Sequence, residues 1–220
     1  MEMFQQHEAL PGSAATAAVE ERMAFLKKVY GLLTLSVLFA AGTAYVTQGM
    51  VGPGMFWPVM IAYIAMVFVA QAVARKPGIN VLAMFAFTGL SGVVLGMVVP
   101  AYNAHIVEQA LALTVLIFAG LTFYVMSSKK DFSFMGGFLF VGLLVIIGGS
   151  LLNAFVFQSA AGEFIISAGG VILFSGFILF DTSNILRNYD VRDYTSATLA
   201  LYLDILNLFL FLLRLLSNRN

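Results

Sequence analysis

The sequence contains no cysteine and only two histidines among its 220 residues. The absence of cysteine excludes a disulfide framework, a thiolate metal site and a cysteine nucleophile. The two histidines, His7 and His105, lie in the N-terminal tail and at the edge of an apolar segment, so a histidine metal site is not expected. No phosphate-binding loop and no Ser-His-Asp arrangement is present.

Charged residues are scarce as well, at 10% of the chain, whereas soluble domains contain roughly 25%. Hydrophobic residues make up 61%, and Phe alone occurs 21 times. A water-soluble chain of this length could not bury so much apolar surface, so the composition predicts an integral membrane protein. The net charge of zero, with no basic cluster, argues against a nucleic-acid partner.

Seven apolar segments are each close to the roughly 20 residues that a helix needs to cross a bilayer. The segments are Leu26–Gln48, Met55–Ala74, Ile79–Pro100, His105–Met126, Phe132–Phe157, Glu163–Leu186 and Thr195–Leu216. Each is continuously apolar rather than alternating, which favours helices over the strands of a barrel. The sequence therefore predicts an all-α integral membrane protein with seven transmembrane helices.

The basic residues are distributed unevenly between the loops. Nine of the eleven Lys and Arg residues lie before or at the start of the first segment or follow the second, fourth and sixth, and the loops after the first, third and fifth contain none. The positive-inside rule then places the amino terminus in the cytosol and the carboxyl terminus outside.

Residues 1–24 form a polar, Ala-rich tail that contains Pro11-Gly12-Ser13 and the acidic pair Glu20 and Glu21. The tail lacks the apolar core with basic flank that a signal peptide needs. We expect a mostly disordered cytosolic tail at residues 1–24, with a helix that can start as early as Ala17, and a seven-helix transmembrane domain at residues 25–220.

The last two apolar segments each carry one aspartate in their interior, Asp181 in ILFDTSNIL and Asp204 in LALYLDILNLFLFLL. A carboxylate in a lipid-length helix costs roughly 2.5–3.5 kcal/mol on insertion scales unless it faces protein, water or an ion. From the helical rise, Asp181 lies roughly 8 Å and Asp204 roughly 13 Å from the cytosolic ends of their helices. Because the loop Arg187–Tyr194 between the segments is short, the two helices are expected to be neighbours and the two carboxylates to meet.

Two carboxylates in one low-dielectric site cannot both ionise at low cost, so they titrate as a pair. Such a pair can hold a shared proton or exchange it for a cation, and oxygen-only ligands favour a hard ion such as calcium. We therefore predict a pH-sensing site that binds calcium transiently at Asp181 and Asp204. Asn184 and Asn207 support it, because each lies three residues further along the same helix face. The alternative is that each aspartate only hydrogen-bonds a neighbouring helix.

Three stretches late in the chain resemble the transmembrane Bax-inhibitor-motif family, most closely its bacterial branch. They are KKDFSFMGGFLFVGLL at Lys129–Leu144, LFDTSNIL at Leu179–Leu186 and LALYLDILNLFLFLLRLL at Leu199–Leu216. FAFTGLSGVVLG at Phe85–Gly96 is similar to the third span of that family. The resemblance implies a seven-helix fold in which span seven is held centrally by the other six.

The resemblance also implies a pH-sensitive calcium leak of the bacterial inner membrane, controlled by an aspartate pair that corresponds to Asp181 and Asp204. Calcium is then the transported species, and no cofactor is bound permanently. In the calcium-leak members an arginine at the cytosolic end of span two helps to close the pore. Arg75 in AVARKPG is the nearest candidate, displaced by about one position.

Two alternatives to a calcium leak remain. An enterobacterial member of the family is a partner and modulator of the membrane-bound AAA protease FtsH, for which the polar tail would act as a handle. An intramembrane aspartyl protease would also use two aspartates, and Tyr202-Leu203-Asp204 is similar to its YD element. Its GxGD element is missing, since Asp181 follows Ile178-Leu179-Phe180. We therefore do not expect an enzyme.

Overall fold

The computed structural model describes residues 13–128 and 130–218, in which seven helices are long and apolar enough to cross a membrane. They are α1 (Val19–Thr47), α2 (Phe56–Val73), α3 (Ile79–Val98), α4 (Ala104–Ser127), α5 (Gly136–Leu152), α6 (Ala160–Arg187) and α7 (Tyr194–Ser217). Four short helical turns flank them: η1 (Pro53–Met55), η2 (Val99–Ala101), η3 (Ser133–Met135) and η4 (Asn153–Phe157). The only β pairing in the described part of the chain is an isolated bridge between Ser13 and Asp190. The predicted all-α membrane fold is confirmed.

Local signals set several of the helix ends. Gly78 has a φ of 82° directly before α3, a conformation that side chains with a Cβ rarely adopt. The side chain of Asn103 accepts a hydrogen bond from the backbone N–H of His105 and caps α4. Ser159 caps α6 in the same way through the N–H of Gly162. These caps satisfy N–H groups that a helix start leaves without an internal partner.

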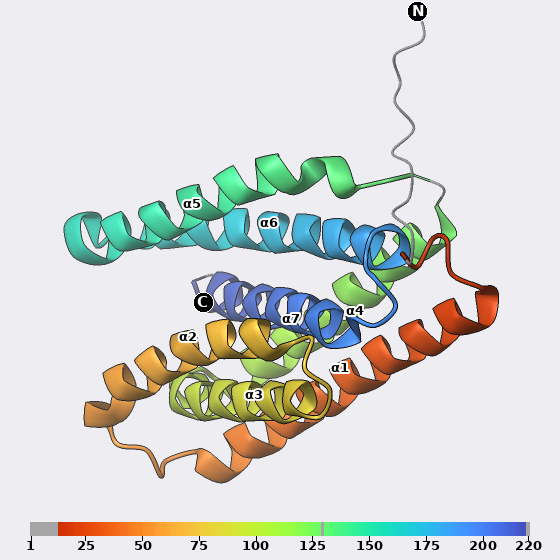
Figure 1. The fold of residues 1–220 in the computed structure, drawn as a ribbon. Coiled ribbons are helices and arrows are strands. Elements are labelled where there is room, and N and C mark those ends of the chain that lie inside the picture. Colours follow the sequence, from red (N-terminus) through yellow and green to blue (C-terminus); the bar gives the residue numbers. More distant parts are fainter. Residues whose placement is uncertain (1–12, 129, 219–220) are drawn as a thin grey trace, which may run out of the picture.

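Helix α7 lies at the centre of the bundle. Figure 1 shows it between the pair α5 and α6 on one side and α1, α2 and α3 on the other. In its most apolar stretch, 56% of the residues are buried inside the protein, against 6% for α2 and for α5. Its 24 residues span roughly 36 Å, which exceeds the roughly 30 Å hydrocarbon core of a bilayer. The central position implied by the family resemblance is confirmed.

Several close helix contacts depend on glycine, and two positions show this most clearly. A Cβ on Gly92 of α3 would lie 2.5 Å from the backbone oxygen of Ala40 in α1. A Cβ on Gly170 of α6 would overlap the ring of Phe211 in α7. The absence of a side chain at these positions lets the backbones approach, as is common where membrane helices pack.

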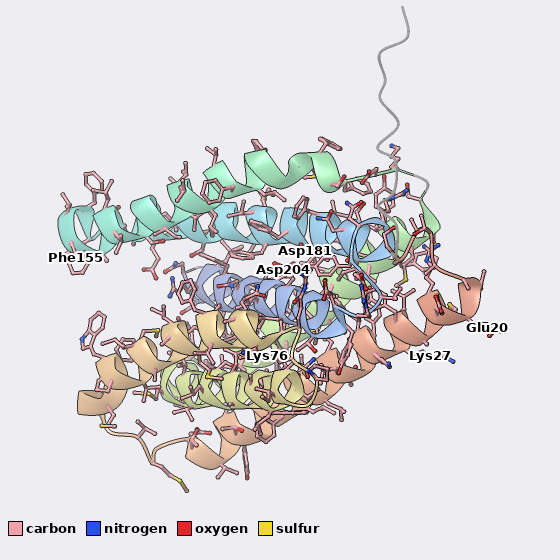
Figure 2. The ribbon with its side chains drawn as sticks, in the orientation of Figure 1. Glu20, Lys27, Lys76, Phe155, Asp181 and Asp204 are labelled. Carbon is pink, nitrogen blue, oxygen red and sulfur yellow. The ribbon has the colours of Figure 1, made fainter. Side chains whose placement is uncertain are left out.

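The basic residues Arg75, Lys130, Arg187 and Arg192 all lie at the end of the bundle where α2, α4 and α6 end and α7 begins. We call this the basic end. Figure 2 labels Lys27 and Lys76 at the same end, and Phe155 at the opposite one.

The N-terminal boundary differs from the expectation of a disordered tail at residues 1–24. Helix α1 already begins at Val19, and Ser13 and Ala14 are only 2% and 0% exposed. Residues 1–12 lie outside the described part of the chain. The start of α1 at Val19 lies within the range expected from Ala17 onward, whereas the packing of Ser13 and Ala14 was not indicated by the sequence. The reason is tertiary, since Ala14 packs against residues that follow it by more than 170 positions in the chain.

Candidate functional site

Asp181 on α6 and Asp204 on α7 face each other between the two helices (Figure 2). Their carboxyl groups lie within hydrogen-bonding reach, so a proton held by one can be shared with the other. Asp204 is only 3% exposed, and its Oδ2 atom has no hydrogen-bond partner in the described structure. The structure thus brings together the two aspartates that the sequence singled out.

This arrangement is energetically unfavourable for the fold. A buried polar atom without a partner costs roughly 1–3 kcal/mol. The two asparagines that follow the aspartates do not remove this cost. Asn184 Oδ1 accepts a hydrogen bond from Asn188 Nδ2 at 2.7 Å, and Asn207 Nδ2 donates to the backbone oxygen of Leu203 at 2.8 Å. In these contacts neither asparagine bonds an aspartate.

A cleft of about 530 Å³ runs along the helices beside the aspartate pair. Its floor is one face of α7, because the lining residues of that helix follow a spacing of three and four positions. These residues are Ala200, Leu203, Asp204, Asn207 and Phe211. Faces of α5 and α6 and the side chain of Gln71 from α2 complete the lining. Ser150, Gln71 and Asn207 are the only uncharged polar residues in this otherwise apolar lining.

Arg75 does not lie at the aspartate pair. It follows α2 and forms a bidentate ion pair with Asp193, with Nε–Oδ1 and Nη2–Oδ2 distances of 3.1 Å and 2.8 Å. This hydrogen bonding raises the pKa of Arg75 above its ordinary value. The arginine therefore attaches the end of α2 to the α6–α7 loop (residues 188–193) at the basic end.

Tyr189 is a site residue that sequence reasoning missed. It belongs to the α6–α7 loop, and its backbone N–H donates to the carbonyl oxygen of Asn184 at 3.0 Å. Burial raises the pKa of Tyr189, and the nearby charges of Asp181 and Asp204 raise it further. Tyr189 lines a hollow at the basic end together with Asn184, which lies three residues after Asp181 on the same helix face. The sequence did not indicate a role for Tyr189, because a tyrosine next to Asn188 in a polar loop has no distinctive pattern.

Ser183 is a second missed residue, two positions after Asp181. Its hydroxyl donates to Asp131 Oδ1 and accepts from the N–H of Phe132, both at 3.0 Å. These bonds attach the connection between α4 and α5 to α6, on a different face of the helix from Asp181.

In residues 13–128 and 130–218 no group of three or more His, Asp or Glu side chains is placed to hold a metal ion together. Calcium takes roughly 6–8 oxygen ligands. A calcium ion at Asp181 and Asp204 would therefore draw most of its ligands from water and from amide or backbone oxygens. The arrangement suits brief contact with a cation.

Comparisons with known proteins agree with this architecture. A family model described as "Inhibitor of apoptosis-promoting Bax1" matches residues 22–220. The chain is 38% identical over 218 residues to the Golgi anti-apoptotic protein of Vaccinia virus (strain Lister), covering 94% of this chain and 91% of that protein. It is 34% identical over 214 residues to protein lifeguard 4 of Mus musculus, covering 94% and 90%.

A bacterial relative matches at similar length. An uncharacterized membrane protein of Vibrio cholerae is 40% identical over 201 residues, which cover 89% of each chain. The family match includes all seven helices almost completely, together with both aspartates. The chain therefore belongs to the Bax inhibitor family of multi-pass membrane proteins.

Proposed function

We propose that this protein is a pH-sensitive calcium leak channel of a bacterial inner membrane, gated by Asp181 and Asp204. The observation that carries the proposal is the buried Oδ2 atom of Asp204. It has no partner in the described structure and lies beside a second carboxyl group in a cleft within the membrane-spanning helices. Ionisable residues at such depth are rare in membrane proteins and usually belong to ion or proton pathways.

The chemistry of the pair supports a site that answers to both protons and cations. Two negative charges in a low-dielectric site repel each other strongly, and either a shared proton or a bound cation relieves the repulsion. Because Asp181 and Asp204 lie on different helices, their charge state biases the contact between α6 and α7. A change of pH then alters the passage of calcium.

The charge distribution supports the orientation that this proposal needs. The basic end carries Arg75, Lys130, Arg187 and Arg192, and by the positive-inside rule it faces the cytosol. The aspartate pair then lies in the cytosolic half of the membrane, where cytosolic protons reach it. The carboxyl terminus lies on the outer side.

The test is calcium flux into proteoliposomes across roughly pH 5.5–8. This range covers the pH values at which pH-sensing side chains change their charge under physiological conditions. Three proteins are compared: wild type, Asp181→Asn and Asp204→Asn. We expect a pH-dependent flux in wild type and a lost or shifted pH dependence in each variant. Lys76→Gln is the matched control, because it removes a charge from an exposed position at the same basic end and should leave the pH profile unchanged.

If all three folded proteins give only background calcium flux at every pH, the proposal of a calcium leak is wrong. Association with the FtsH protease would then be the favoured function, and pull-down of the protease with the wild-type protein would test it.

A further inference from the structure

The segment Ser13–Ala18, which we call the N-terminal strap, lies against the α6–α7 loop. The backbone N–H of Ala14 donates to the carbonyl oxygen of Tyr189 at 2.9 Å, and Ser13 pairs with Asp190 in an antiparallel bridge. The carbonyl oxygen of Ser13 accepts from the N–H groups of Thr16 and Ala17, each at 3.0 Å. The strap is therefore a folded turn that leads into α1.

The buried side chains of the strap belong to the core of the bundle. Ala14 is 0% exposed and lies in the same apolar cluster as Ile185 and Ala197, against which Tyr189 packs. Ser13 also lines a hollow of about 420 Å³ at the basic end, together with Asn184 and Tyr189. Asn184 lies one helical turn beyond Asp181. The strap thus lies over Tyr189 and Asn184, and Asn184 is on the face of α6 that carries Asp181.

The N-terminal strap is short and buries few apolar atoms compared with a transmembrane helix. Its buried side chains, Ser and Ala, remove little apolar surface from water, and one backbone hydrogen bond joins Ala14 to the loop. Such a segment can open locally while the seven helices stay folded.

We propose that the N-terminal strap is an autoinhibitory plug. When it is seated on Tyr189 it closes the route by which water and cations reach Asp181 and Asp204 from the basic end. When it leaves, the entrance to the pair opens. The plug depends on the proposed function in one respect only, which is that the ion whose passage it controls is calcium.

The first experiment locks the strap in place with a disulfide. Residues that pair directly across an antiparallel bridge have Cα atoms about 4.5–5.5 Å apart, within the roughly 4.4–6.8 Å that a disulfide spans. The double variant Ser13→Cys/Asp190→Cys introduces the only two thiols, because the natural chain has no cysteine. The single variants Ser13→Cys and Asp190→Cys are the controls.

Two measurements report the effect of the disulfide. One is modification of Asp181 and Asp204 by a water-soluble carbodiimide, measured by mass spectrometry, and the other is calcium flux in proteoliposomes. In the oxidised double variant we expect both to fall severalfold, and to recover when a reductant breaks the disulfide. The single variants should not respond to the reductant.

The second experiment releases the strap. Ala14→Leu places a larger side chain where Ala14 is fully buried, whereas Ala15→Leu alters the adjacent alanine, which is exposed. We expect Ala14→Leu to increase carbodiimide modification and flux severalfold and Ala15→Leu to leave both unchanged. Thermal unfolding of the two variants verifies that the bundle is folded.

Failure to form the disulfide would overturn the inference, since the strap would not be seated on the loop. Equal modification of the aspartates in the locked and reduced proteins would overturn it as well. If modification responds to the lock but no variant passes calcium, the plug is supported and the calcium leak is the proposal that fails.

Discussion

Arg75 and Asp193 join the end of α2 to the start of α7 through two parallel hydrogen bonds of 3.1 Å and 2.8 Å. The arginine side chain is 81% exposed and the aspartate side chain 14%, so the pair lies at the surface of the basic end. The carboxylate precedes the first residue of α7 but does not cap the helix through its side chain. The pair therefore connects two helices whose other mutual contacts are few.

Removal of this ion pair should have a small effect on stability. Exposed ion pairs contribute about 0–1 kcal/mol, because water screens the charges. Arg75→Ala should accordingly lower the free energy of unfolding only slightly. Lys76→Ala, at the adjacent exposed position, is the control and should have no effect. Thermal unfolding in detergent measures both, and a severe loss in Arg75→Ala would show that α2 depends on this one attachment.

Asp131 should make the stability depend on pH in the acidic range. Partial burial alone would raise the pKa of Asp131, but hydrogen bonds from Ser133 and Ser183 lower it overall. Because the pKa is lower in the folded state, the stabilisation is present above the ordinary carboxyl pKa of roughly 4 and is lost as the pH falls below it. The comparison is thermal unfolding of wild type and Asp131→Asn from about pH 6 to pH 3.

The two proteins should differ above the ordinary carboxyl pKa and converge at the acidic end. A difference that persists unchanged at the acidic end would show that the ionised carboxylate is not responsible. Ser183→Ala removes one of the hydrogen bonds and should raise the pKa of Asp131.

Asp204 should lower the free energy of unfolding, because its buried carboxyl group serves the proposed function rather than the packing of the helices. Its buried Oδ2 atom has no partner in the described residues, which costs roughly 1–3 kcal/mol. The double variant Asp181→Leu/Asp204→Leu should raise the free energy of unfolding by about 1–4 kcal/mol, because it removes both buried carboxyl groups and leaves neither without its partner. The same variant should lose pH-dependent calcium flux. A loss of stability would instead show that the aspartates hold the helices together.

Gly92 should tolerate no side chain. A Cβ at this position would lie 2.5 Å from the backbone oxygen of Ala40 and 2.7 Å from Cβ of Thr43, so α1 would have to move. Gly92→Ala should therefore lower the free energy of unfolding by about 1–3 kcal/mol, as overpacking usually does. Gly120→Ala in α4 is the matched control, because no atom lies within 4 Å of its expected Cβ. A neutral Gly92→Ala variant would mean that α1 and α3 separate easily.

The sequence by itself determined the fold class. Lipid offers no hydrogen bonds to a backbone, so seven long apolar segments had to become seven helices. It also determined that Asp181 and Asp204 would meet, because both lie at similar depth on helices joined by a short loop. Both conclusions depend on the lipid environment and on the spacing of residues along the chain, and that spacing can be read directly from a sequence.

Only the tertiary structure decided which helices are central and which groups meet across long separations. In a membrane the lipid-facing and the core-facing residues are both apolar, so the mean hydropathy of α7 (2.1) is close to that of α2 (2.0) and α5 (2.4) although their burial is very different. Arg75 and Asp193 are 118 positions apart, and Ala14 and Tyr189 even further. No periodic pattern records such contacts, because they arise only when the packed helices bring the loops of the basic end together.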